Sequence, residues 1–183
     1  MGKTKLKNES HESTLETALD FTGADLEANR EGKLTAKQYD RLLTQRNEKR
    51  RTALTVLGLV VFVIVFCGFV ALTSGAKPLN LGDAFFPLVI FVPLFVLILV
   101  AAANRWRKLA QDLRMQAVHA CQGRVNLNVE ASATDTGFTV AIQDQKWKVD
   151  KAAFLAFKNG DPYCVYYTPH SRTLLSAEWL REE

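Results

Sequence analysis

The sequence predicts an α+β membrane protein, in which an antiparallel transmembrane helical hairpin with juxtamembrane helices precedes a small antiparallel β-sheet or barrel. Two uncharged runs predict the hairpin, because residues 52–76 and 84–104 carry no charged side chain although 23% of the 183 residues are charged. A third observation predicts the sheet: after Gly123 the helical spacing of apolar residues gives way to alternation of apolar and polar residues.

The uncharged runs have the length that a membrane span needs. About 20 apolar residues in a helix cross a hydrocarbon core of about 30 Å, and both runs reach that length. The linker contains Gly75, Pro78 and Gly82, which favour a tight turn. Basic residues flank the outer ends of the runs: Arg46, Lys49, Arg50 and Arg51 before the first, and Arg105, Arg107, Lys108 and Arg114 after the second. This bias predicts a multi-pass protein of the cell membrane with both termini in the cytoplasm.

The composition divides the chain into seven predicted segments. They are a disordered tail (1–12), a cytoplasmic helical segment (13–51), a first transmembrane helix (52–76), a short external loop (77–83), a second transmembrane helix (84–104), a juxtamembrane amphipathic helix (105–122) and a small cytoplasmic β domain (123–183).

Two amphipathic patterns lie next to the predicted spans. Thr35 and Gln38 have the spacing of a capping box, and the helix that they begin carries an apolar stripe at Tyr39, Leu42 and Leu43. The second stripe recurs at steps of three or four residues and comprises Trp106, Leu109, Leu113, Ala117 and Cys121. We expect the two stripes to pack on each other, with docking to another protein as the alternative.

The carboxy-terminal pattern predicts five or six short strands. Apolar residues alternate with polar ones in residues 124–130, 138–142 and 146–149, and strand-forming residues fill 163–167 and 172–179. Turn residues separate the last strands at 159–162 and 168–171. Residues 154–157 are also assigned to a strand. Core packing of Tyr163, Tyr166, Tyr167 and Trp179 across strands is favoured over ligand stacking.

No pattern in the sequence predicts chemistry. It contains no nucleophile elbow, phosphate-binding loop, zinc-protease motif or paired-cysteine motif, so we predict no catalytic residue, no cofactor and no metal site. The three cysteines have no ligand or disulfide spacing. The net charge of +4 is spread over both polar ends, which disfavours nucleic acid as a partner. His170, close to Ser171 and Glu178, is the one group that suggests a hydrolase triad.

Two stretches carry a resemblance to a family. Residues 157–178, with Gly160, Tyr163, Pro169 and Glu178, and residues 25–38, with Asn29 and Gly32, resemble parts of uncharacterised bacterial two-helix membrane proteins that have a small cytoplasmic carboxy-terminal β domain. The resemblance covers about 35 residues. It implies a membrane-anchored β domain and no known reaction, cofactor or catalytic residue.

The function expected from these patterns is binding rather than catalysis. The chain would be a membrane-anchored interaction or scaffold protein, an accessory subunit of a larger membrane complex. Its partners would be the lipid bilayer and another membrane or cytoplasmic protein, or a second copy. One alternative is a subunit of a pore- or transporter-forming oligomer, and another is an enzyme that modifies lipids. The candidate interaction surface comprises Asp25, Asn29, Arg30, Gln38, Tyr167, Pro169, His170 and Arg172.

Overall fold

The computed structural model describes residues 12–73, 100, 104, 106–131 and 136–180. The chain forms two compact units, one of Met1–Arg41 with Gln111–Glu183 and the other of Leu42–Ala110. The first unit holds the sheet, and α3 (Ala36–Thr73) supplies most of the described part of the second.

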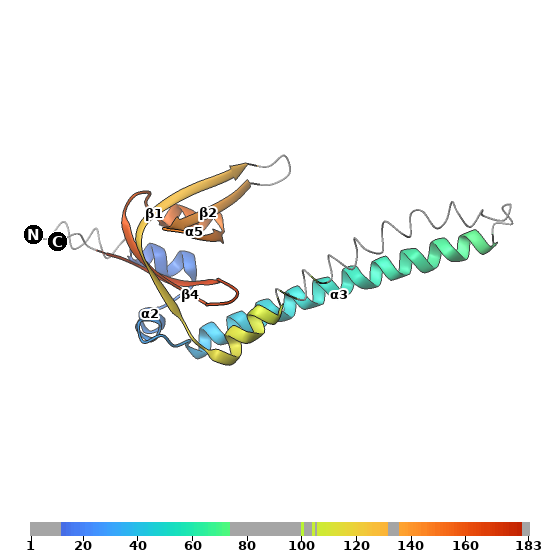
Figure 1. Ribbon diagram of the computed structural model, residues 1–183, viewed down its shortest axis with the longest axis horizontal. Helices are drawn as coiled ribbons and strands as arrows, with labels where there is room; N and C mark the ends of the chain where they lie inside the picture. The colour runs from blue at the N-terminus through green and yellow to red at the C-terminus, as the bar shows by residue number, and fades with distance from the viewer. Residues whose placement is uncertain (1–11, 74–99, 101–103, 105, 132–135, 181–183) are drawn as a thin grey trace, which may run out of the picture. The chain divides into compact units, whose positions relative to one another are not determined.

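The first unit contains a five-stranded antiparallel sheet with the order β3-β2-β1-β4-β5. The strands are β1 (His119–Ala131), β2 (Thr136–Ile142), β3 (Gln145–Val149), β4 (Pro162–Tyr167) and β5 (Leu174–Trp179). Figure 1 shows β1 as a long strand, and it pairs with both β2 and β4 at the centre of the sheet. The predicted small antiparallel sheet is therefore confirmed.

Strand β1 changes partner near its middle. Its first half pairs with β4, from His119 opposite Tyr167 to Arg124 opposite Pro162. Its second half pairs with β2, beginning with Val125 opposite Ile142. Gly123 lies at the change, where a Cβ atom would stand 2.8 Å from the Cγ2 atom of Ile142. The glycine thus permits a close approach of β1 to the end of β2.

The core of this unit lies between the sheet and the first described helix, residues 12–19. Leu15 from that helix and Phe21 just after it are buried with side chains from all five strands of the sheet. Aromatic rings meet edge to face, with centroids 5.3 Å apart for Trp147 and Tyr167 and 5.1 Å for Phe157 and Tyr163. Packing of these rings, which the sequence favoured over ligand stacking, holds the strands together.

Two segments differ from their predicted structure. Residues 154–157 do not form a strand, because α5 (Lys151–Ala156) occupies most of them. The Asp150 carboxylate caps α5 by accepting the N–H of Ala153 at 2.7 Å. The predicted helix 105–122 is described as helical only over 106–115, and Gln116 then takes a positive φ of 49°. Its periodic Ala117 and Cys121 belong instead to a β-bridge with Lys33 and to β1.

The predicted membrane hairpin has to be corrected. Within the part of the chain that the structure describes, no helix is both long and apolar enough to cross a bilayer. This finding overturns the transmembrane fold class, the assignment as a multi-pass membrane protein and the localisation with both termini cytoplasmic. The predicted loop 77–83 and all of the second run except Val100 and Asn104 lie outside the described residues.

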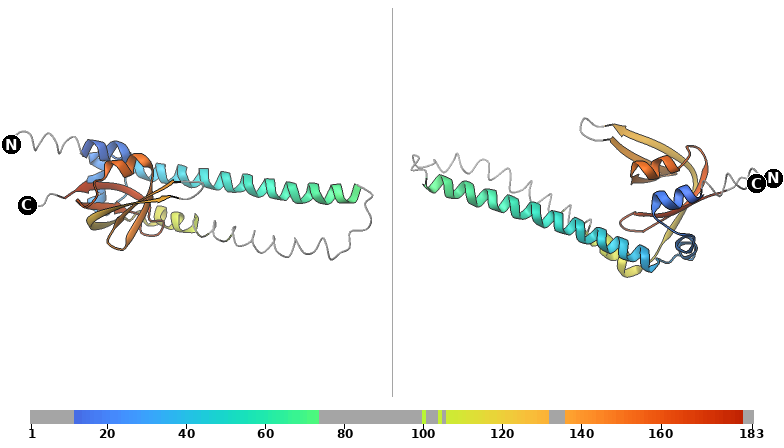
Figure 2. Two further views of the ribbon diagram at one scale, coloured as in Figure 1. Left: turned by 90° about the horizontal axis from the view of Figure 1, so that it is seen from above. Right: turned by 180° about the vertical axis from the view of Figure 1, so that it is seen from behind.

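The sequence argument failed because absence of charge is a weaker criterion than a continuous apolar helix of sufficient length. The uncharged run does not form a helix of its own. It continues a 38-residue helix, α3, whose earlier turns carry Asp40, Arg41, Glu48 and Arg51. The views in Figure 2 show α3 as one uninterrupted helix.

Candidate interaction surface

The Asp25 carboxylate joins α2 (Gly23–Arg30) to the start of α3. Both the main-chain N–H and the hydroxyl of Thr22 donate to its Oδ2 atom at 2.9 Å, and the Thr35 hydroxyl donates to Oδ1. Burial raises the pKa of Asp25, but the hydrogen bonds from Thr35 and Thr22 lower it by more, so the pKa lies below its usual value. Asp25 is only 3% exposed and therefore serves the fold.

The predicted capping box at Thr35 is confirmed. The Gln38 N–H donates to the Thr35 hydroxyl at 3.2 Å, and the Thr35 N–H donates to Oε1 of Gln38 at 3.4 Å. Gln38 is buried, and its Nε2 atom has no hydrogen-bond partner among the described residues.

A second polar group links α2 to the edge of the sheet. The Asn29 side chain donates to the Ser176 hydroxyl at 2.6 Å, and the Arg30 guanidinium pairs with Glu178. The Tyr166 hydroxyl donates to the other Glu178 oxygen at 2.7 Å. The Glu178 carboxylate raises the pKa of Arg30, and burial followed by the hydrogen bond to Glu178 raises the pKa of Tyr166. Both carboxylate oxygens of Glu178 therefore have a partner within this unit.

A third group fixes the turn between β4 and β5. The carboxylate of Asp112, which is completely buried, accepts the main-chain N–H groups of His170 at 2.9 Å and Ser171 at 2.6 Å. The His170 Nδ1 atom lies 3.4 Å from the same carboxylate. Arg172 follows with a positive φ of 54° and is exposed.

The structure divides the eight residues of the predicted surface. Asp25, Asn29 and Gln38 are buried, Tyr167, Pro169 and His170 are half-buried, and Arg30 and Arg172 are exposed. Their role in binding stays a prediction. Sequence reasoning missed Asp112, whose hydrogen-bond partners lie almost 60 positions further along the chain. It paired His170 with Glu178, whereas the structure gives these two residues different partners, Asp112 for His170 and Arg30 with Tyr166 for Glu178.

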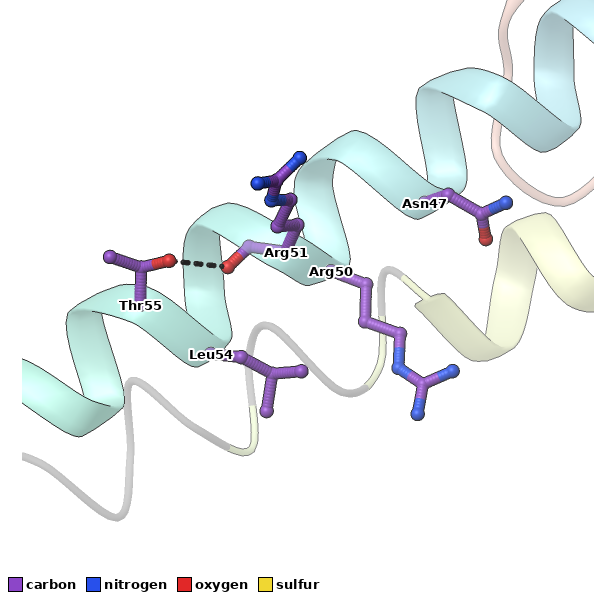
Figure 3. Close-up of a pocket in the computed structure, with 5 residues that line it drawn as sticks. All are labelled: Asn47, Arg50, Arg51, Leu54 and Thr55. Atoms are coloured by element: carbon purple, nitrogen blue, oxygen red, sulfur yellow. Dashed lines mark hydrogen bonds between the residues drawn. The ribbon is translucent and has the colours of Figure 1, made fainter.

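A separate surface lies on α3 and was not predicted as a site. A shallow depression of about 460 Å³ is lined by Asn47, Arg50, Arg51, Leu54 and Thr55 (Figure 3). Figure 3 shows Asn47, Arg50 and Leu54 projecting from the same side of the helix. The Thr55 hydroxyl donates to the Arg51 carbonyl at 3.0 Å and is therefore satisfied within α3. Neither guanidinium has an ion pair within the described residues.

Large apolar side chains continue this surface along α3. Leu54 is 53% exposed, Val61 50% and Phe62 65%. Isolated exposed apolar residues are common, whereas contiguous apolar patches are a feature of interaction sites. The sequence signal was present in the run of apolar residues, which was interpreted as a lipid-facing segment.

Neither a metal site nor a similar protein identifies a function for these surfaces. Over the described ranges, no group of three or more His, Cys, Asp or Glu residues is placed to hold a metal ion. Cys121 and Cys164 are free thiols, and the β1–β4 register places them on opposite faces of the sheet.

No family model, curated protein or solved structure matches the chain. The described residues define the class of protein only as a small α+β domain and a long helix, α3, in the same chain.

Proposed function

We propose that the chain is an interaction protein whose helix α3 binds an amphipathic helix of another protein. The observation that carries this proposal is the exposed apolar surface of α3, where Leu54, Val61 and Phe62 each leave half or more of their area in solvent. Complete burial of a fully exposed side chain of this kind contributes about 1.5–3 kcal/mol, and a partner that covers the exposed half of each of the three gains a corresponding share of it.

The residues that line the depression share one face of the helix with Val61 and Phe62. Asn47, Arg50, Arg51, Leu54 and Thr55 are separated by steps of three, one, three and one, and Val61 and Phe62 continue the same rows. We call this set, with Gly58 between its two halves, the α3 face. At 100° per residue the members span about 140° of the helix circumference, as expected for a helix-binding surface. Val56 lies on the opposite side although it is 54% exposed.

Gly58 supports close approach by a second helix. A Cβ atom at this position would meet nothing within 4 Å, so the space in front of it is open. Glycine inside a helix is destabilising by roughly 0.5–1 kcal/mol relative to alanine. A helix that crosses at Gly58 would use this gap, because small residues allow two helix backbones to come together.

The charges on the α3 face favour a partner other than a second copy. Arg50 and Arg51 are exposed, and they would oppose the same residues of an identical helix packed in parallel. A partner helix with carboxylates next to its apolar stripe would instead complement both guanidinium groups. We therefore assign the partner as an acidic amphipathic helix.

The alternative functions have less support. A pore or transporter subunit would need membrane spans, and within the described residues no helix has the length and apolar character of one. An enzyme would need His170 and Glu178 to act together. His170 lies against Asp112, whereas Glu178 is held by Arg30 and Tyr166.

A photo-crosslinking amino acid at Val61, compared with one at Val56, tests the proposal. The two positions have similar exposure on opposite sides of the same helix, so they are matched apart from the face. We expect one partner species to be crosslinked from Val61 and not from Val56. The captured protein would then be purified, and Leu54→Asp with Phe62→Asp should weaken its binding more than tenfold. Equal crosslinking from both positions, or crosslinks only between copies of this chain, would contradict the proposal.

A further inference from the structure

The outer edge of β3 is unpaired among the described strands. β3 is the strand at one end of the sheet, and among the described strands it pairs only with β2. Lys146 and Lys148 are exposed, while Trp147 between them points into the core and is 2% exposed. The strand therefore has a regular alternation with both lysines on one face.

The hairpin register identifies which backbone groups face outward. Ile142 pairs with Gln145 around a two-residue loop whose first residue, Gln143, has a positive φ of 52°, as primed turns require. The residues that flank such a loop exchange hydrogen bonds, and the bonded pairs then alternate along the ladder. The N–H and C=O groups of Lys146 and Lys148 consequently point away from β2.

Neither lysine is engaged elsewhere. Within the described residues Lys146 and Lys148 have no ion pair, and the same holds for the exposed Lys151 just beyond the strand. The nearby Asp150 carboxylate is occupied in capping α5. The edge thus offers unpaired backbone donors and acceptors, with the three lysines outnumbering the two carboxylates of Asp144 and Asp150 by one.

We infer that β3 binds an extended acidic segment of another protein, which adds a sixth strand to the sheet. The segment has carboxylates at two alternate positions, because residues two apart on a strand share a face and would meet Lys146 and Lys148. A second copy of β3 is the wrong occupant, since it would bring lysines against lysines. Edge lysines prevent such self-pairing, and the same charges select an acidic partner. This surface is independent of the α3 face.

Binding of a synthetic peptide to the full chain tests the inference. The probe is acetyl-Ser-Thr-Glu-Val-Glu-Thr-Ser-amide, and the control peptide has lysine in place of both glutamates. We expect the glutamate peptide to bind at least tenfold more tightly and to slow amide hydrogen exchange at Lys146 and Lys148. The variant Lys146→Glu/Lys148→Glu should reverse the preference between the two peptides.

A matched pair of variants separates strand addition from simple charge attraction. Lys148→Thr and Lys148→Pro remove the same charge, but only the proline removes an outward N–H, which an edge strand tolerates. Strand addition predicts that Lys148→Pro binds at least fivefold more weakly than Lys148→Thr at an equal thermal unfolding midpoint. If Lys148→Pro lowers that midpoint, amide hydrogen exchange at Lys146 in the Lys148→Thr variant is the deciding measurement. Strand addition predicts that the glutamate peptide slows this exchange. No binding at 1 mM peptide, equal binding of both peptides, or concentration-dependent pairing of the chain with itself would overturn the inference.

Discussion

The carboxylate of Asp112 accepts the main-chain N–H of Ser171 at 2.6 Å, and this contact fixes the turn between β4 and β5 to the segment that precedes β1. Because Asp112 is fully buried and also accepts the His170 N–H, two charge-assisted hydrogen bonds depend on one side chain. The turn that carries the exposed Arg172 is therefore held from the interior.

Replacing Asp112 by alanine should destabilise the chain by about 2 kcal/mol, because two part-buried N–H groups lose a charged acceptor. Asp112→Asn keeps one acceptor oxygen and should cost roughly half as much. Denaturant unfolding of both variants checks this expectation. Equal losses for the two substitutions would show that the carboxylate is not specifically required.

The close approach at Gly123 gives a second prediction. Gly123→Ala places a Cβ atom against the Ile142 side chain, and overpacking of this kind costs about 1–3 kcal/mol. Gly137→Ala is the control, since its Cβ would meet only ordinary contacts, the nearest at 3.7 Å. We expect thermal unfolding at a lower temperature for the first variant alone. An unchanged midpoint for Gly123→Ala would mean that β1 can shift away from β2 at no cost.

Asp25 makes stability depend on pH. Its pKa in the folded chain lies below the ordinary value of 3.8, so the stabilisation is fully present above pH 3.8 and is lost as the pH falls through the folded value. Asp25→Asn should cost about 1–2 kcal/mol at pH 7, where the carboxylate accepts three hydrogen bonds. The difference in unfolding free energy between the two proteins should shrink in acid. A difference that stays constant from pH 7 to pH 2 would contradict the assigned role.

Gly58 separates helix stability from partner binding. Gly58→Ala should stabilise α3 locally by roughly 0.5–1 kcal/mol, because alanine favours the helix. The same change should weaken the partner complex at least threefold, since the added methyl group fills the crossing point. Hydrogen exchange along α3 measures the first effect, and titration with the purified partner measures the second. Tighter binding by Gly58→Ala would argue that no helix crosses there.

Local patterns predicted the sheet and the capping box, whereas the tertiary contacts were not predictable. Alternation in residues 124–130 and 146–149 identified β1 and β3, because a half-buried strand imposes that period. Thr35 and Gln38 were recognisable because a capping box is a local motif. The contact of Asp112 with the turn at His170 has no local signature. The error at residues 154–157 has a simple cause, since a short apolar run fits a strand and one helical turn equally well.

The uncharged run in α3 shows a second limit of sequence reasoning. Leu54, Val61 and Phe62 were assigned to lipid from composition alone, but composition does not distinguish a lipid-facing surface from one that binds protein. Their spacing with Arg50 and Arg51 becomes informative only when the residues are placed on one continuous helix.

A charge exchange across the α3 face tests the central claim most directly. The affinity of the purified partner would be measured for the native chain and for Arg50→Glu/Arg51→Glu, each with the native partner and with a partner whose facing carboxylates are replaced by lysine. The account predicts at least a tenfold loss when either side alone is changed, and recovery of most of that loss when both are changed. Equal affinity in all four combinations would contradict an acidic helix bound at Arg50 and Arg51.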